Sequence, residues 1–389
     1  MPRLGDVQVA EAIIADIRRN RRHFLPGKEC TPTEVREHFD GQILVDGLDI
    51  EERLLILSIL PSGSSEILLE EADKGLSKSK TFHARYRTAG GLSKRFVVKV
   101  GPVRKIDREA SAVQEFAAPL LDGTNNPVWR RGVEKAVIAQ ELVGLNQGAR
   151  VTSLRNELRA KPGARDSVSR LLTEGLAPWY DEPIREGCSD ASLDSLFNRH
   201  VKKGDGVVFP PDWTLLQEWT EQISGIAWQP ANAVIRELLN RTVSVPRSIS
   251  HGDLHSQNIL VDSAGRCWPI DFAWCTNGSS PVVDLVMLEC SIKFLAFPMR
   301  ADLREMIRIE RALTNEYIYS GTLPKMPYAT ELGNVLGGLL EVRRFALGAG
   351  ISFDDYLACL CVMTSSLATH ANLNRPLVLA SLQMLMGSL

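Results

Sequence analysis

The segment HGDLHSQNIL, residues 251–260, contains an aspartate and an asparagine five positions apart, Asp253 and Asn258. A second aspartate, Asp271, follows thirteen positions later in the tripeptide IDF. Phosphoryl transfer needs a positioned acceptor hydroxyl, metal ions that bridge phosphate oxygens and cations that neutralise developing charge. Oxygen ligands, one carboxylate and one amide beside the phosphates of a nucleotide, suit Mg²⁺. The spacing therefore fits a short loop that directs Asp253 at an acceptor and Asn258 at a metal ion.

A hairpin should connect the two expected metal ligands. Residues 259–261 and 266–270 have strand character, and the turn Asp262-Ser263-Ala264-Gly265 joins them. Such a hairpin would return the chain so that Asp271 ends the second strand beside Asn258. It is the only hairpin that we expect in the second part of the chain.

The remaining elements divide the chain into three parts. Residues 1–62 show helical stripes of apolar side chains, and we assign them to an N-terminal helical extension. Residues 63–143 contain strand-like runs at 66–71, 82–88, 95–100 and 134–143, with a helix expected over 103–121. The Gly90-Gly91 turn predicts that the runs 82–88 and 95–100 form a hairpin. Residues 144–389 are mainly helical, including a helix expected over 213–226. This pattern predicts an α+β fold with a small antiparallel sheet lobe before a helical lobe.

Composition excludes some broad classes of partner and site. The formal charge of -2 gives no general attraction to nucleic acid or to an anionic membrane. The seven cysteines are scattered without a CxxC pair, which favours reduced thiols over a zinc or redox site. The N-terminus has no apolar signal region and no apolar stretch reaches bilayer length, so we expect a cytoplasmic protein.

HGDLHSQNIL and IDFAW resemble the motifs of the aminoglycoside phosphotransferase and choline kinase superfamily, which has the two-lobed protein-kinase-like fold. The resemblance implies that Asp253 is the catalytic base or orients the acceptor hydroxyl. It implies that Asn258 and Asp271 hold Mg²⁺ and that ATP is the phosphoryl donor.

A kinase-like site also needs a lysine on the third strand of the sheet lobe. Lys99 meets this requirement in FVVKV, residues 96–100. Alternation along the strand places Val97 and Lys99 on the face opposite Phe96, Val98 and Val100. Val97 would then cover the adenine while Lys99 reaches the phosphates.

The lysine should have a glutamate partner on the following helix, where Glu109 and Glu115 are both available. At 100° per residue, Glu109 falls within the apolar arc of the helix and Glu115 points away from it. The apolar arc consists of Ile106, Val113, Phe116 and Leu120. A carboxylate on an inward face needs a cation, so we expect Glu109 to pair with Lys99.

Two further segments should contact the nucleotide. The loop at residues 73–81 would cover the phosphates, with Gly75 allowing close approach and Ser77 or Ser79 donating hydrogen bonds. Lys78 and Lys80 in this loop either contact phosphate or are solvated. The resemblance also implies a hinge from Glu141 to Val143, whose backbone groups would meet the base.

Residues flanking the catalytic aspartate should hold its loop in place. The resemblance implies this role for His251 and His255. Asp284, in SPVVDLVML, is expected to cap a helix and brace the catalytic loop.

Two functions follow from these patterns. The first is an ATP- and Mg²⁺-dependent phosphotransferase acting on a small-molecule hydroxyl or amine whose identity the sequence does not give. The motifs FVVKVGP, REASAVQEF and HGDLHSQNIL over residues 64–389 also resemble the kinase-like ternary-complex-associated domains of bacterial conflict systems. That resemblance implies the second function, a nucleotide-binding regulatory or scaffold module with little turnover, with residues 1–62 available to a protein partner.

Overall fold

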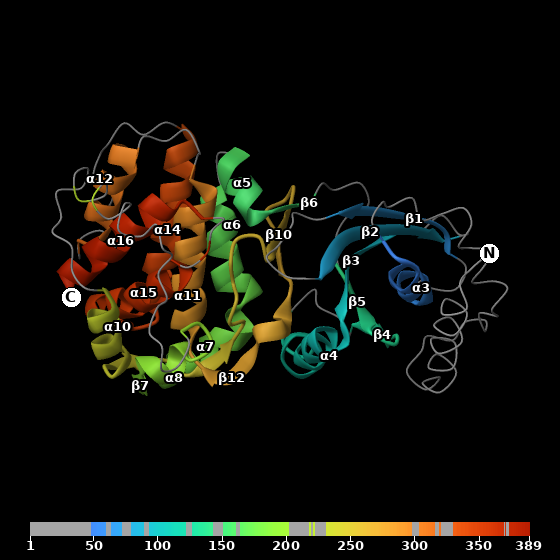
Figure 1. Ribbon diagram of the computed structural model, residues 1–389, viewed down its shortest axis with the longest axis horizontal. Coiled ribbons are helices and arrows are strands. Elements are labelled where there is room, and N and C mark those ends of the chain that lie inside the picture. The colour runs from blue at the N-terminus through green and yellow to red at the C-terminus, as the bar shows by residue number, and fades with distance from the viewer. Residues whose placement is uncertain are drawn as a thin grey trace. The chain divides into compact units, whose positions relative to one another are not determined.

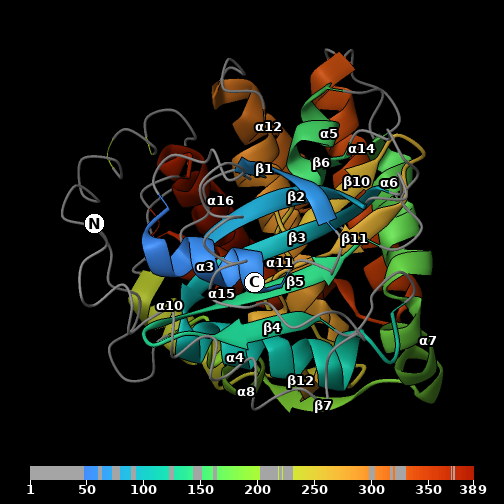
Figure 2. The same cartoon turned by 90° about the vertical axis from the view of Figure 1, so that its right-hand side faces the viewer.

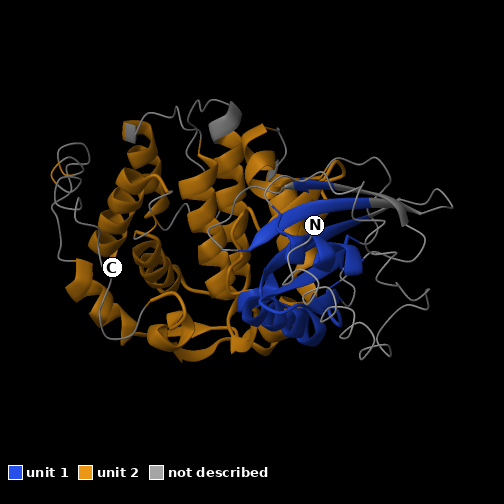
Figure 3. Ribbon diagram, turned by 45° about the vertical axis from the view of Figure 1, so that its right-hand side comes forward, with its two compact units in different colours: residues 1–149, 270–274 blue, residues 150–269, 275–389 orange. Residues whose placement is uncertain are grey.

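The computed structural model describes most of the chain, in segments separated by gaps, and they fall into two units (Figure 3). One unit comprises residues 1–149 with 270–274, and the other residues 150–269 with 275–389. The predicted domain boundaries stay a prediction. The described residues are 48–59, 64–71, 79–88, 93–121, 127–142, 151–160, 164–201, 218, 221, 231–297, 303–315, 319, 330–368, 370 and 373–389.

The first unit contains a five-stranded antiparallel sheet with the strand order β1-β2-β3-β5-β4 (Figure 1). Its strands are β1 Ser64–Glu71, β2 Lys80–Thr88, β3 Ser93–Pro102, β4 Val128–Arg131 and β5 Lys135–Glu141. The hairpin predicted between the second and third runs is present, because β2 pairs with β3 in continuous register. Strand β4, only four residues long, was not predicted.

One face of this sheet is covered by helix α3, Ile50–Ser58 (Figure 2). Leu54, Leu55 and Ile56 of α3 pack with Val98 and Val100 of β3 in one apolar cluster. Its other buried members are Leu48, Ile59, Phe82, Ala84, Val137 and Ala139. The predicted helical stripe at residues 9–17 lies outside the described residues.

Helix α4, Val103–Ala112, follows β3 directly and continues into a π-helical turn, Val113–Ala117. Its inward side carries Ile106, Glu109, Ala110 and Val113, all buried. The helix predicted over 103–121 is thus present but ends at Ala117. Glu109 lies on its buried side as the periodicity indicated, whereas Leu120 of the predicted apolar arc is 41% exposed.

The second unit is mainly helical. Its longer helices are α7 Ala177–Glu186, α10 Ala231–Leu239, α11 Pro281–Ser291, α12 Leu303–Leu313, α14 Thr330–Gly348, α15 Phe353–Leu367 and α16 Arg375–Ser388. Shorter helices are α5 Leu154–Ala160, α6 Ala164–Arg170 and α8 Leu193–Phe197. Together with the antiparallel sheet of the first unit, this confirms the predicted α+β fold class, with a small antiparallel sheet and a mainly helical second part. The helix expected over 213–226 falls almost wholly outside the described residues.

The hairpin expected in the second part is present, but the second unit also contains strands that the sequence did not predict. The hairpin of β10 Ile259–Asp262 and β11 Cys267–Pro269 is present, but β6 Val151–Ser153 pairs with β10 as a third strand. Two more antiparallel pairs form, β7 Ser189–Ser192 with β8 Thr242–Val245, and β9 Ser248–Ser250 with β12 Thr276–Ser279. Strands of three or four residues are too short to show alternation, and their partners are distant in sequence.

The longest described helix is α14, and it carries four charged side chains, Glu331, Glu341, Arg343 and Arg344. No helix among the described residues combines the length and apolar character needed to cross a bilayer.

Four of the buried charged side chains in the helical unit form one cluster. Glu289 of α11 accepts two hydrogen bonds from Arg343 of α14, at 2.9 and 2.6 Å, and one from Tyr356 at 2.8 Å. Lys293 lies 3.4 Å from Glu289 and 2.7 Å from Glu310 of α12. The group contains two carboxylates and two cations, so its formal charges balance. Burial alone raises the pKa of Glu289, but Arg343 and Lys293 outweigh it and lower the pKa to about 2.

Removal of one member should leave the others uncompensated. We expect Arg343→Met to lower the free energy of unfolding by about 3–5 kcal/mol, because Glu289 would keep its charge in the interior without its bidentate partner. Urea unfolding measures this change. Arg344→Met is the matched control, because the Arg344 side chain is 46% exposed and its ion pair with Glu341 should contribute about 1 kcal/mol or less. Equal losses in both variants would contradict the assignment.

Candidate functional site

Strand β3 presents two different faces. Val98 and Val100 join the apolar cluster under α3, so the intervening side chains Val97 and Lys99 lie on the opposite face. Both are buried, Val97 with 7% of its surface exposed and Lys99 with 4%. A valine beside a buried ammonium group is the arrangement that the strand pattern predicted.

Lys99 contacts two carboxylates within the first unit. Its Nζ lies 2.8 Å from Glu109 Oε2 of α4 and 2.5 Å from Asp271 Oδ1. Glu115 is exposed, so the structure distinguishes the two candidate glutamates as the helical periodicity did. The direct contact between Lys99 and Asp271 was not predicted, since the sequence gave Asp271 only a metal-binding role.

The electrostatics of this cluster follow from two carboxylates sharing one ammonium. Burial alone lowers the pKa of Lys99, and the charges of Glu109 and Asp271 outweigh it and raise that pKa. Burial raises the pKa of Glu109 to about 7 against the attraction of Lys99, and the charge of Asp271 acts in the same direction as burial.

The segment that carries Asp271 is tightly constrained. Asp271 has φ = 64°, in the left-handed region that costs a residue with a side chain roughly 1 kcal/mol or more. Phe272 is fully buried at the start of a 3₁₀ turn, Phe272–Trp274. The guanidinium of Arg108 on α4 lies 5.7 Å from the centre of the Trp274 ring. The segment is therefore held by Lys99 of β3 through Asp271 and by Arg108 of α4 through Trp274.

In the second unit, Asp284 holds the backbone of the loop at residues 251–258. Its carboxylate accepts hydrogen bonds from the backbone N–H of His251, at 2.7 Å, and of Gly252, at 2.8 Å. The hydroxyl of Tyr180 also donates to it, at 2.7 Å. Asp284 is fully buried, and its pKa is raised because burial outweighs these donors. The predicted bracing role fits this geometry, but the predicted cap was wrong: Ser280 caps α11 and Asp284 sits inside its first turn.

Gly252 requires its small size for the turn that it makes. Its φ is 76°, a conformation that glycine adopts without strain. Its carbonyl lies 2.8 Å from His200 Nε2, while its N–H is held by Asp284. Both polar backbone groups of the residue before Asp253 are thus fixed. His200, far away in sequence, carried no pattern that could have indicated this role.

Within the loop, Asp253 and Asn258 are linked through the backbone. The Asn258 Nδ2 group donates to the Asp253 carbonyl at 3.0 Å, and the Asn258 N–H donates to the His255 carbonyl at 2.8 Å. Because only the amide nitrogen can donate to a carbonyl, the Asn258 Oδ1 atom is the one left for a metal ion. The Asp253 carboxylate is 30% exposed, with His255 Nε2 4.0 Å from its Oδ2.

Other predicted nucleotide-binding residues are partly described. Ser79 precedes β2 and lies against Gly101, where an added Cβ would be 2.3 Å from the Ser79 Oγ. Glu141 ends β5 opposite Phe96. Gly75, Ser77 and Val143 lie outside the described residues. Lys80 directs its ammonium group to Glu52, on the α3 side of the sheet.

The described residues can be searched for side chains that could hold a metal ion. No group of three or more His, Cys, Asp or Glu side chains in this part of the chain is arranged to hold a metal ion. A nucleotide-linked Mg²⁺ does not need one, because the ion keeps waters and takes phosphate oxygens beside one or two protein ligands. The oxygens of Asn258 and Asp271 fit that chemistry.

Comparison with known proteins gives one family match. Residues 213–348 match the model of the family described as Ternary complex associated domain 9, which confirms the resemblance to those domains over this segment. No curated protein matches the sequence.

Solved structures provide distant likenesses. A macrolide 2'-phosphotransferase from Brachybacterium faecium is 16% identical, with 79% of this chain and 93% of that chain covered and a TM-score of 0.31. A choline kinase from Streptococcus pneumoniae is 10% identical, with 74% of this chain and 94% of that chain covered and a TM-score of 0.28. An ethanolamine kinase from Plasmodium vivax is 12% identical, with 83% of this chain and 81% of that chain covered and a TM-score of 0.31. TM-scores this low carry no argument about the activity of this chain.

Protonation of His200 should loosen the loop. Burial lowers the pKa of His200 below its ordinary value of 6.5. The unfolded chain therefore binds more protons than the folded chain as the pH falls through about 6.5, and stability falls with it. We expect the melting temperature of the wild type to drop more steeply between pH 7.5 and 5.5 than that of His200→Gln. Parallel pH profiles would contradict this assignment.

Proposed function

We propose that this protein is an ATP- and Mg²⁺-dependent phosphotransferase that acts on a hydroxyl or amine of a small molecule. The observation that carries the proposal is the buried Lys99 ammonium, shared between Glu109 of α4 and the Asp271 carboxylate. A buried strand lysine held by a glutamate of the following helix is the arrangement expected for binding nucleotide phosphates, and the aspartate beside it is a suitable ligand for the accompanying metal ion.

Each residue has a part in this proposal. The Lys99 ammonium would bind phosphate oxygens of ATP, and Glu109 would keep it oriented. Asn258 and Asp271 would hold Mg²⁺, which supplies positive charge against the phosphate oxygens. The Asp253 carboxylate would orient the acceptor hydroxyl and accept its proton as the acceptor oxygen bonds to the γ-phosphorus and the bond to the β–γ bridging oxygen breaks.

The structure of the loop supports a chemical role for Asp253. Its neighbours use their polar groups for internal hydrogen bonds, as Gly252 does with Asp284 and His200. The Asp253 carboxylate remains accessible while its own carbonyl is tied to Asn258. A rigid loop that presents one accessible carboxylate is suited to positioning an acceptor.

A second candidate is a nucleotide-binding regulatory module in a multi-protein assembly. The match of residues 213–348 to a ternary-complex-associated family model favours it. Such a module would bind ATP through the same Lys99 cluster and would need no acceptor at Asp253.

Substitution of Asp253 separates the two candidates. We expect Asp253→Asn to lower ATP turnover by a factor on the order of 10²–10⁴, because the proton acceptor is lost, while the affinity for ATP and Mg²⁺ stays within about twofold. Turnover is measured as ADP formation, alone and with a panel of hydroxylated and amine-bearing compounds followed by ³¹P NMR; affinity is measured by calorimetry.

Asp190→Asn is the matched control, since Asp190 is an exposed aspartate on β7 of the same unit. Wild-type turnover that survives in Asp253→Asn would contradict the catalytic assignment. Tight binding of ATP by the wild type without turnover for any acceptor would favour the regulatory module. Absence of ATP binding would contradict both candidates.

A further inference from the structure

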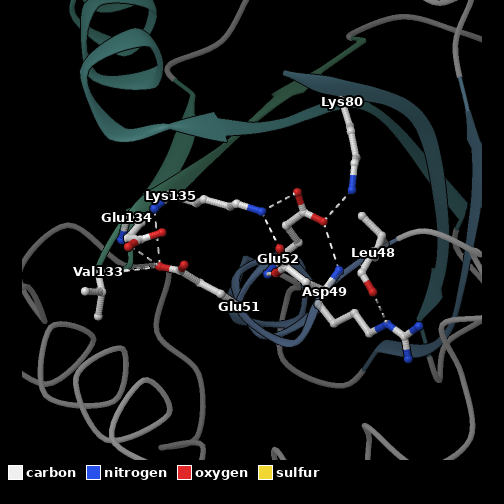
Figure 4. A network of polar contacts seen from close by, with 9 residues as sticks. Leu48, Asp49, Glu51, Glu52, Lys80, Val133, Glu134 and Lys135 are labelled. Carbon is white, nitrogen blue, oxygen red and sulfur yellow. Dashed lines mark hydrogen bonds and ion pairs between the residues drawn. The ribbon is translucent and has the colours of Figure 1, made fainter. Parts of the chain in front are cut away.

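Three acidic residues at the start of α3 are held to the sheet by a network of polar contacts (Figure 4). Asp49 caps the helix by accepting from the Glu52 N–H at 2.9 Å, and Glu52 accepts from the Asp49 N–H at 3.0 Å. Lys135, at the start of β5, donates to both Asp49 and Glu52. The acidic residues at the start of α3 therefore do more than interact favourably with the helix dipole, because they also connect the helix to the sheet.

Glu51 is bound by the turn between β4 and β5. Its Oε1 accepts from the backbone N–H groups of Val133, Glu134 and Lys135, at 2.7, 3.0 and 3.3 Å. A Cβ atom added to Gly132 would lie 2.3 Å from the same oxygen. The turn thus has the donors and the open space to receive this one carboxylate, which attaches α3 to β4 and β5.

Glu52 occupies the centre of the network, with 3% of its surface exposed. Its Oε1 accepts from Lys135 at 2.8 Å, and its Oε2 accepts from Lys80 at 2.6 Å. Burial alone raises the pKa of Glu52, and the hydrogen bonds from Lys135 and Lys80 outweigh it, so the pKa is lowered. Glu52 is therefore a charged group that ties α3 to two different strands.

Lys80 is the partner of Glu52 that lies near the proposed nucleotide-binding residues. It is the first residue of β2 and belongs to the stretch 73–81 that is predicted to cover the phosphates, of which residues 73–78 lie outside the described residues. In the β2–β3 register Lys80 pairs with Val100, and Thr81 pairs with Lys99. Lys80 thus shares the α3 face with Val100, while the next residue lies opposite the lysine expected to bind phosphate.

We propose that Glu52 is a positioning residue for nucleotide binding, which holds Lys80 and through it the start of β2, where Thr81 pairs with Lys99. Glu52 acts from the face of the sheet opposite Lys99 and does not touch the nucleotide. The ion pair sets the position of the start of β2 relative to Lys99 in β3. This inference rests on the proposed function, because it assumes that the first unit binds ATP.

The chain offers a matched set of variants for a test. Glu52→Gln and Lys80→Met both remove the ion pair between Glu52 and Lys80. Lys135→Met removes the other lysine that contacts the Glu52 carboxylate and leaves the pair with Lys80 intact. We expect Glu52→Gln and Lys80→Met each to weaken ATP binding about five- to tenfold in calorimetry with Mg²⁺. Lys135→Met should stay within about twofold of the wild type, even though all three variants melt at lower temperature.

Two further measurements separate positioning from a general loss of structure. The double variant should bind ATP about as well as the weaker single variant, because both changes break one contact. Adenosine, which lacks phosphates, should bind all variants with unchanged affinity. Lys80→Arg keeps the charge and should retain most of the ATP affinity.

Several outcomes would overturn the inference. An ATP affinity in Lys135→Met as low as in Glu52→Gln would show that the network acts only through stability. A loss in Lys80→Met without one in Glu52→Gln would show that Lys80 contacts phosphate itself. Wild-type ATP binding that no variant changes would overturn this inference alone, whereas no wild-type binding would overturn the proposed function as well.

Discussion

The ammonium group of Lys99 lies inside the protein, and an isolated charge there would cost several kcal/mol. Ion pairs with two carboxylates offset this cost, one from α4 and one from the segment 270–274. The requirement fixes which side of α4 faces the sheet, since Glu109 and not Glu115 must point inward. It also helps to explain why Asp271 tolerates a left-handed backbone conformation, because its carboxylate gains a charged partner there.

The same physical device recurs in the second unit with a different purpose. Asp284 is a buried carboxylate that accepts hydrogen bonds from two backbone N–H groups as well as from the hydroxyls of Tyr180 and Ser250, so it fixes the course of the chain through residues 251 and 252. Glu289, in contrast, meets Arg343 and Lys293 and fastens helices together. Buried carboxylates thus position a strand lysine, a loop and a group of helices. A carboxylate that accepts from backbone N–H groups fixes the course of the chain, whereas one paired with side chains connects separate elements.

Local patterns were enough to predict the parts of the site that depend on one element or on neighbours in sequence. The faces of β3 follow from alternation over five residues, and the inward side of α4 follows from helical periodicity. The β2–β3 hairpin needed only its turn and two adjacent runs. Contacts between elements far apart in sequence could not be predicted in this way. His200 reaches Gly252 across 52 positions, and Tyr180 reaches Asp284 across 104. Glu51 and Glu52 have the sequence signature of ordinary acids in the first turn of a helix, yet their partners are β2 and the β4–β5 turn.

The surroundings of Asp253 distinguish it from the residues that serve the fold. His251 is completely buried, Gly252 is held at both polar backbone groups, and the Asn258 amide nitrogen bonds to the Asp253 carbonyl. These contacts shape the loop without using the Asp253 carboxylate, which stays 30% exposed. A fold under no functional demand gains nothing from ordering a loop so completely around one accessible charge, since fixing each backbone residue costs about 1–2 kcal/mol of conformational free energy. The ordered loop and the accessible carboxylate therefore support a role for Asp253 in contacting a ligand, and the polar group on that ligand should be a hydrogen-bond donor, as a hydroxyl or an amine is.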